Sequence, residues 1–215
     1  MTGPNGEPIY ILKEGASNRS GRNAQSNNIM AAKAVAESVR STLGPLGFDK
    51  MLVDGGGGVL ITNDGATILT EIDADHPAAK IVIEISQTQD AQCHDGTTSA
   101  AVLSGALLEQ AEELIDKQIH PATITKGYHF AKKILMEELE NMGWECSESD
   151  LLDAARTSIT GKSAESAIDV LADICVSALD AIRDDDGVDL DNVKVSTFEG
   201  GSYEQSELLP GLVVE

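Results

Sequence analysis

The segment Asp95-Gly96-Thr97-Thr98-Ser99 combines a carboxylate, a glycine and three hydroxyls, and it directly precedes a long apolar stretch with high helix propensity. The first amides of a helix have no partner inside the helix, and the helix dipole makes this end positive. Both features favour binding of an anion such as phosphate. Gly96 permits close approach of a ligand, the hydroxyls can donate to phosphate oxygens, and Asp95 can bind magnesium.

The same segment is also typical of an ordinary helix start. Aspartate, serine and threonine are common N-cap residues, because their side-chain oxygens accept hydrogen bonds from the first-turn amides. Taken alone, the segment therefore leaves two interpretations open, a phosphate site and a capped helix.

Two further turns carry residues of the same kind. Leu43-Gly44-Pro45-Leu46-Gly47 follows a predicted helix, and Thr62-Asn63-Asp64-Gly65-Ala66-Thr67 follows a predicted strand. Asp64 can orient an attacking water molecule or support a metal ion. Glycine, proline, asparagine and aspartate also dominate ordinary turns, so each segment has a purely structural interpretation as well.

A fourth turn, Thr157-Ser158-Ile159-Thr160-Gly161-Lys162, ends a predicted helix and presents a lysine that can contact a terminal phosphate. A Gly-Lys pair is part of a P-loop. This segment lacks the leading glycine of that motif and follows a helix instead of opening one, which excludes a Walker A loop. A phosphotransferase that uses Gly161-Lys162 is accordingly the least supported function.

The elements that must position these turns are mainly helices. Hydrophobic residues make up 41% of the chain and aromatic residues only 3%, which favours closely packed helices with a core of Ala, Val, Ile and Leu. Apolar residues recur at three- and four-residue spacing, and proline and glycine punctuate these runs. The predicted helices cover residues 28–42, 66–72, 77–88, 97–117, 121–142, 150–159 and 164–183. We expect the helix at 97–117 to be largely buried.

Strand-like segments are short. Residues 50–54 and 59–63 flank four glycines and predict a hairpin, while residues 192–198 and 212–214 also have strand character. The fold class is therefore mainly α (α+β). We expect a polar leader at 1–27 and a domain boundary near residues 143–149.

Composition excludes several classes of function. The formal net charge of −21 argues against nucleic-acid and anionic-membrane surfaces, which need clustered lysine and arginine. The three cysteines lack the spacing of a zinc site or a disulfide framework, and no run is long enough to span a membrane. His76, His120 and His129 share no ligand spacing, and Asp184-Asp185-Asp186 is interpreted as a solvated turn. A cytoplasmic protein is expected.

Taken in order, these segments resemble the group II chaperonins, the archaeal thermosome and its eukaryotic cytosolic relatives. The resemblance covers nearly the whole chain. It is carried by residues 28–35, 43–45, 49–54, 62–69, 76–80, 88–90, 95–98, 119–121, 127–128, 157–162 and 188–193. The resemblance implies a helical equatorial ATP-binding domain with a small β-hairpin at 28–146. It also implies part of an α/β intermediate domain at 147–209 and the start of an apical domain at 210–215.

The resemblance also implies cofactors and roles for individual residues. ATP or ADP with Mg²⁺ would be the ligand, Asp95 would bind the metal, Asp64 would position the hydrolytic water, and Lys162 would report the γ-phosphate. The remaining nucleotide contacts implied are Leu43, Gly44, Pro45, Gly65, Gly96, Thr97, Thr98, Ser99, Thr160 and Gly161.

Three residues depart from the family pattern. His94 stands where the family usually has glycine, beside the implied metal ligand, and can narrow the pocket or add a pH-sensitive contact. Leu46 replaces a basic residue, and Ser99 replaces a threonine. The chain also ends near the point where an apical domain would begin, so the resemblance implies that half of the ATP pocket is missing.

Two functions of different classes follow from the resemblance. The first is an ATP-hydrolysing chaperone subunit in a homo- or hetero-oligomeric double ring, which assists non-native client proteins and couples hydrolysis to lid closure. The second is a truncated half-subunit that binds nucleotide or ring partners without hydrolysing ATP.

Overall fold

The computed structural model describes residues 20–184 and 187–211. The expected strand at 212–214, residues 185–186 of the acidic turn, and residues 1–19 of the expected leader lie outside this part. The chain divides into two compact units, one formed by residues up to Arg40 with Gly65–Pro121, the other by Ser41–Asp64 with Ala122–Glu215. Each unit thus combines segments that are distant in sequence.

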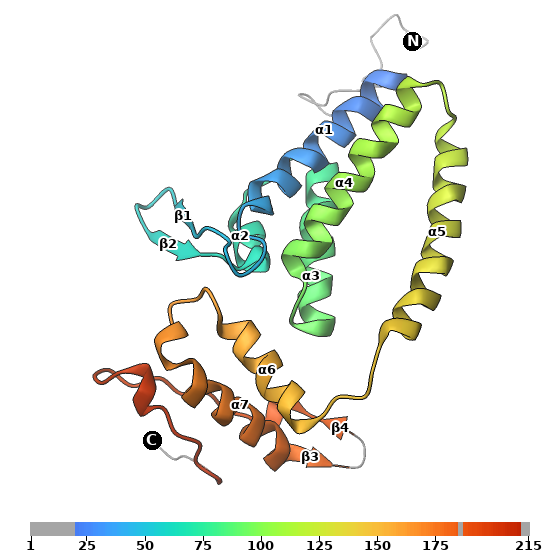
Figure 1. Cartoon of the computed structure of the whole chain (residues 1–215). Helices are drawn as coiled ribbons and strands as arrows, with labels where there is room; N and C mark the ends of the chain where they lie inside the picture. Colours follow the sequence, from blue (N-terminus) through green and yellow to red (C-terminus); the bar gives the residue numbers. More distant parts are fainter. Residues whose placement is uncertain (1–19, 185–186, 212–215) are drawn as a thin grey trace, which may run out of the picture. The chain divides into compact units, whose positions relative to one another are not determined.

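The first unit contains helices α1 (Gly21–Arg40), α2 (Gly65–Glu71), α3 (Pro77–Cys93) and α4 (Thr97–Asp116). Helices α1, α3 and α4 lie side by side (Figure 1). The sequence predicts that these four helices exist, but α1 begins at Gly21, seven residues before the expected start, and α3 ends at Cys93, five residues after the expected end. The mainly α class is confirmed.

Small residues allow α1 and α4 to approach closely. Ala32, Ala36 and Ala101 are at most 2% exposed, and a Cβ on Gly105 would overlap the Cβ of Ala36. Because atoms in a protein interior are close-packed, any larger side chain at Gly105 would force the two helices apart.

The expectation that α4 is largely buried is wrong. Its buried residues are Thr97, Ala101, Gly105 and Ala111 only, and they form one face. Leu103 is 57% exposed and lies on another face. Apolar composition alone predicted burial, but the inward face is built from small residues because the helix backbones are close together.

Helix α3 has defined structures at both ends. The Nδ1 atom of His76 accepts a hydrogen bond from the amide of Ala78 at 3.2 Å, so His76 is the N-cap. Its Nε2 atom lies 2.6 Å from the carboxamide of Asn27 in α1. This contact ties the start of α3 to α1.

At the other end of α3, His94 adopts a left-handed backbone conformation with φ of 53°. Its amide donates to the carbonyl of Asp90 at 2.8 Å. A left-handed residue directly after a helix is usually glycine, because a Cβ is crowded there. This backbone requirement explains why glycine suits position 94, whatever the histidine side chain contacts.

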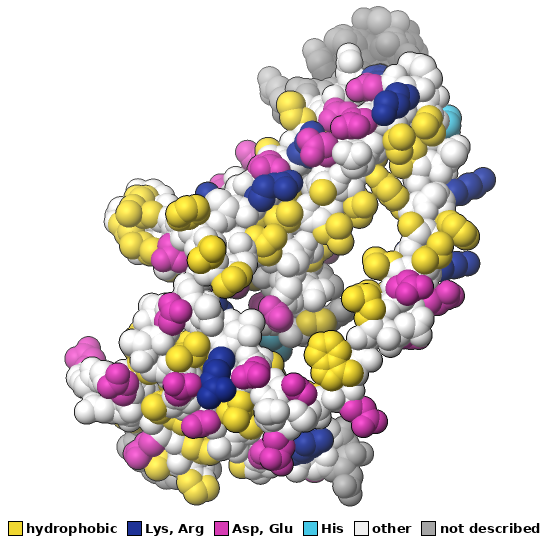
Figure 2. All heavy atoms as spheres, in the orientation of Figure 1, with side chains coloured by type: hydrophobic (Ala, Val, Ile, Leu, Met, Phe, Trp, Pro, Cys, Tyr) yellow, Lys and Arg dark blue, Asp and Glu magenta, His cyan; other side chains and the backbone are white. Residues whose placement is uncertain are grey.

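The second unit begins with a hairpin of β1 (Lys50–Val53) and β2 (Val59–Thr62), paired antiparallel with Met51 opposite Ile61. The sequence predicts this hairpin correctly. Its apolar side chains remain largely exposed, and hydrophobic atoms cover the visible face of the hairpin (Figure 2).

The remainder of the second unit is helical with little sheet. Its elements are α5 (Pro121–Met142), α6 (Glu148–Ile159), η1 (Glu165–Ala167), α7 (Ile168–Ile182), β3 (Arg183–Asp184), β4 (Gly187–Val188), η2 (Leu190–Asn192) and η3 (Tyr203–Gln205). Ser147 and Asp150 form a reciprocal capping box at the start of α6. The backbone hydrogen bond from Ser147 holds the pKa of the Asp150 carboxyl below its usual range.

The strand expected at residues 192–198 is wrong. Asn192 ends the short η2 helix, and residues 193–198 have no regular secondary structure. Alternating polarity favours a strand only where a neighbouring strand accepts the backbone hydrogen bonds, and none pairs with this segment in the described part of the chain.

We predict that His94→Gly stabilises the protein. Glycine has no Cβ and so relieves the strain of the left-handed conformation at φ 53°. Its greater conformational freedom in the unfolded state offsets part of this effect, and the free energy of unfolding should rise by about 0.5–1 kcal/mol. Urea unfolding measures the change. Gln118→Gly, at the other described non-glycine position with positive φ, should behave similarly, whereas Gln92→Gly inside α3 should destabilise. Destabilisation by His94→Gly would show that contacts of the histidine side chain stabilise the protein by more than the strain of its backbone costs.

We also predict a pH-dependent contribution from the Lys33–Glu109 ion pair between α1 and α4. Its N–O distance is 2.9 Å, and the hydrogen bond from Lys33 lowers the pKa of the Glu109 carboxyl. The same bond raises the pKa of Lys33. Because the carboxyl pKa is lower in the folded state, the pair stabilises the fold at pH values above the unfolded-state pKa of Glu109. This stabilisation is lost as the pH falls through the folded-state pKa. The raised pKa of Lys33 has the opposite sign: its contribution is lost only as the pH rises through the folded-state pKa of the lysine.

The difference in unfolding free energy between the wild type and Glu109→Gln should therefore stay constant near neutral pH and shrink on acidification. Because the pair is partly exposed, the effect should be small and should weaken in high salt. In a Lys33→Met background the same substitution should lose this pH dependence. Persistence of the pH dependence in that background would contradict the assignment.

Candidate functional site

The turn between α3 and α4 leaves the start of α4 open to a ligand. The N-cap residue is Gly96, with φ of 74°, and it has no side chain that could accept the first-turn amides. The Asp95 carboxylate accepts the amide of Gly96 through Oδ1 at 2.7 Å. Asp95 therefore does not cap the helix, and the interpretation of this segment as a capped helix start is wrong.

Neighbouring helices hold this turn in place. A Cβ on Gly65, the first residue of α2, would overlap Oγ1 of Thr98, so only glycine permits this contact. Thr97 is buried, Thr98 is half-buried, and Asp95 and Ser99 are exposed. The structure thus brings together Gly65 and the segment 95–99, all within the first unit.

Sequence reasoning missed two side chains of α3 that contact this turn. Gln89 donates through Nε2 to the carbonyl of Asp95 at 2.9 Å, and Ser86 donates through Oγ to the carbonyl of Thr97 at 3.3 Å. The segment Thr88-Gln89-Asp90 was among those that carry the family resemblance, but none of its residues was among the expected site residues.

A second group of expected site residues gathers in the second unit. Asn63, which precedes Asp64, donates through Nδ2 to the carbonyl of Gly161 at 3.2 Å. Gly161 has φ of 75°, and a Cβ there would lie 2.8 Å from the carbonyl oxygen of Pro45. Three turns that are far apart in sequence therefore contact one another, and Gly161 is the residue that permits the approach.

Individual residues of this second group are also defined. Gly44 has φ of 85°, and its carbonyl accepts the amide of Gly47 at 3.0 Å. The amide of Asp64 donates to Oγ1 of Thr62 at 3.1 Å, and Thr160 bonds back to α6 through the carbonyl of Arg156. Expected site residues with solvent-exposed side chains in this group are Leu43, Pro45, Asp64 and Lys162.

The expected site residues thus form two groups, one in each compact unit. The first consists of Gly65 with residues 95–99, and the second contains residues 43–45, Asp64 and residues 160–162. In sequence, the groups meet at the peptide bond between Asp64 and Gly65.

The donor set around Asp95 fits magnesium together with a phosphate, but not a site made of protein ligands alone. Among the described residues, no three histidine, cysteine, aspartate or glutamate side chains gather as a metal site. Magnesium is commonly held by one or two carboxylates and completed by phosphate oxygens and water. A single exposed carboxylate beside unpaired helix amides matches that requirement.

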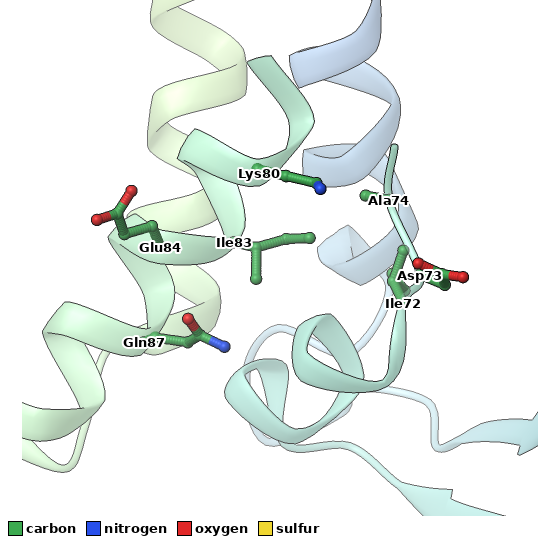
Figure 3. Close-up of a pocket in the computed structure, with 7 residues that line it drawn as sticks. All are labelled: Ile72, Asp73, Ala74, Lys80, Ile83, Glu84 and Gln87. Atoms are coloured by element: carbon green, nitrogen blue, oxygen red, sulfur yellow. The ribbon is translucent and has the colours of Figure 1, made fainter. Parts of the chain in front are cut away.

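A surface hollow of about 450 Å³ lies elsewhere in the first unit, between α3 and the segment after α2 (Figure 3). Lys80 and Ile83 point toward that segment, whereas the Glu84 carboxylate points away. None of the expected site residues lines this hollow. Its charged side chains do not converge on a common point, so it does not compete with the turn at Gly96 as a phosphate site.

The part of the chain described by the structure has no helix with the length and apolar character needed to cross a bilayer. Many aspartate and glutamate side chains and few basic ones occupy the face seen in Figure 2. This distribution agrees with the net charge of −21.

Comparison with known proteins identifies relatives along the whole chain. It is 50% identical to thermosome subunit 1 of Haloferax volcanii and to thermosome subunit beta of Archaeoglobus fulgidus, over 98% of its length in each case. It is 48% identical to a thermosome subunit of Pyrococcus horikoshii, again over 98%. These alignments cover 38% to 40% of the relatives, so the chain spans about two fifths of their length.

Residues 35–215 also match the TCP-1/cpn60 chaperonin family. This match includes the hairpin and both groups of expected site residues. The identities to thermosome subunits agree with the resemblance to group II chaperonins that the motifs carry. The chain therefore belongs to the TCP-1/cpn60 chaperonin family.

Proposed function

We propose that this chain forms part of the Mg-ATP site of an ATP-dependent chaperonin subunit. The observation that supports the proposal most directly is the open N-terminus of α4, which begins at a left-handed Gly96 beside an exposed carboxylate. Amides at this position favour phosphate, and the adjacent Asp95 suits magnesium.

In this proposal the first group of residues binds the phosphates and the metal. The amides that follow Gly96 and the hydroxyls of Thr98 and Ser99 donate to phosphate oxygens, while Asp95 holds magnesium. Thr97 is buried and contributes its backbone. A bound magnesium ion would neutralise charge that develops on the phosphate oxygens.

The second group of residues supplies the remaining functions in the proposal. Leu43, Gly44 and Pro45 contact the nucleotide, Asp64 positions the hydrolytic water, and Lys162 in the turn 160–162 responds to the γ-phosphate. The contacts among Pro45, Asn63 and Gly161 support a shared role, because a change in one turn would alter the others.

The proposal extends to the assembly formed by the relatives. Their name, thermosome subunit, describes parts of a larger particle. We propose ring partners of the same family, non-native proteins as clients, coupling of hydrolysis to lid closure, and a cytoplasmic location. We also propose that residues 28–146 correspond to the equatorial domain and residues 147–209 to the intermediate domain. Nucleotide binding without turnover would instead favour a non-hydrolysing partner of such rings.

Removal of the proposed metal ligand should weaken nucleotide binding only when magnesium is present. Asp95→Asn keeps the shape of the side chain but removes its charge, and the Kd for Mg-ADP measured by calorimetry should rise at least about tenfold. In EDTA the variant and the wild type should converge. Asp73→Asn, an exposed aspartate of the same unit, is the matched control and should bind as the wild type does. Equal loss with and without magnesium would count against a metal role.

Lys162 should distinguish ATP from ADP. In the proposal it responds to the γ-phosphate, so Lys162→Ala should reduce the preference for ATP over ADP about two- to fivefold, the range expected of an exposed charge pair. The affinity for ADP should not change. Lys194→Ala removes another exposed lysine of the same unit and serves as the control. A proportional loss for both nucleotides would contradict the assignment.

A further inference from the structure

Two side chains of α3 bond to backbone carbonyls on either side of Gly96. Gln89 donates to the carbonyl of Asp95, and Ser86 donates to the carbonyl of Thr97. The two donors are three residues apart and thus share one face of α3. Ser86 is 0% exposed, and a Cβ on Gly96 would lie 3.4 Å from Nε2 of Gln89, so the amide of Gln89 packs against the glycine.

Each of these hydrogen bonds fixes the direction of an N–H group. A peptide unit is planar, so its carbonyl and the following amide point in opposite directions within one plane. The carbonyl of Asp95 shares a plane with the amide of Gly96. That amide in turn donates to Oδ1 of Asp95 at 2.7 Å. The Gln89 bond therefore orients, through one peptide plane, the carboxylate proposed to bind magnesium.

Ser86 acts on the next part of the turn in the same way. The carbonyl of Thr97 shares a plane with the amide of Thr98, one of the first-turn amides proposed to donate to phosphate. Glycine at position 96 leaves the backbone free to rotate, because it has no Cβ to restrict φ. Two external hydrogen bonds compensate for that freedom at the point where the ligand would bind.

We propose that Gln89 is a positioning residue for the phosphate and metal turn, holding the Asp95 carboxylate and the Gly96 amide in the arrangement that binds a magnesium nucleotide. The assignment rests on the function proposed above. Gln89 itself does not touch the ligand; it acts through the peptide plane between Asp95 and Gly96.

If Gln89 only stabilised the fold, its loss would have the same effect as loss of another side-chain hydrogen bond of α3. The chain offers such a bond as a matched control. Gln87 lies on the same helix and donates through Nε2 to Oγ1 of Thr70 in α2 at 3.2 Å. Gln87→Met and Gln89→Met each remove one exposed side-chain hydrogen bond, to Thr70 of α2 and to the carbonyl of Asp95 respectively, and keep similar side-chain volume. The two variants should therefore lose similar stability, and only Gln89→Met should disturb the turn.

The experiment compares the two variants and the wild type by calorimetric titration with Mg-ADP, and with ADP in EDTA. Gln89→Met should raise the Kd for Mg-ADP about tenfold or more, as expected when a residue that orients a metal ligand is lost, and should have less effect in EDTA. Gln87→Met should stay within about twofold of the wild type. Equal losses in the two variants, or no loss in Gln89→Met while the wild type binds, would overturn the proposal.

A second measurement separates this proposal from the proposed function. Backbone ¹⁵N relaxation without nucleotide should show a lower order parameter at Gly96 in Gln89→Met than in Gln87→Met, whereas the Thr98 amide, which the Ser86 bond orients, should change less. If the wild type binds no nucleotide, the proposed function fails, but this comparison still decides whether Gln89 positions the turn. Unchanged order parameters would overturn that role.

Discussion

The close approach of α1, α3 and α4 is the constraint on which the first unit depends. Gly105 of α4 lies against Ala36 of α1, and Ala32 and Ala101 are almost fully buried, so small residues form the contact between these two helices. Close packing of this kind fixes helix position to within small displacements. Helix α3 packs against both α1 and α4, and Gln89 reaches the backbone of the turn from there.

The turn itself combines freedom and restraint. Gly96 adopts the left-handed conformation that opens the start of α4, and His94 adopts the same conformation two residues earlier although it carries a Cβ. Two left-handed residues so close together reverse the chain within a few residues. The left-handed His94 and the hydrogen bonds from α3 thus lie in the same turn as the uncapped start of α4 and the Asp95 carboxylate.

The sequence predicted the elements well where local chemistry decides them. Proline at the first position of α3 and α5 gave the starts of these helices, and the four glycines between β1 and β2 gave the hairpin, whereas apolar spacing alone missed the start of α1 and the end of α3. It failed where a partner was needed. Residues 193–198 alternate in polarity but lack a neighbouring strand in the described chain, and α4 is apolar yet buries one face. Local patterns do not specify which neighbours a segment will have.

The sequence by itself determined the residue types of the candidate site, the family to which they point and the helix that follows Gly96. Only the tertiary structure decided that Asp95 is not a cap, that Gly65 must be small to pack on Thr98, and that Gln89 and Ser86 support the turn. The physical reason is that motifs record chemistry along the chain, whereas hydrogen bonds and close contacts between α2, α3 and α4 depend on distances that folding sets.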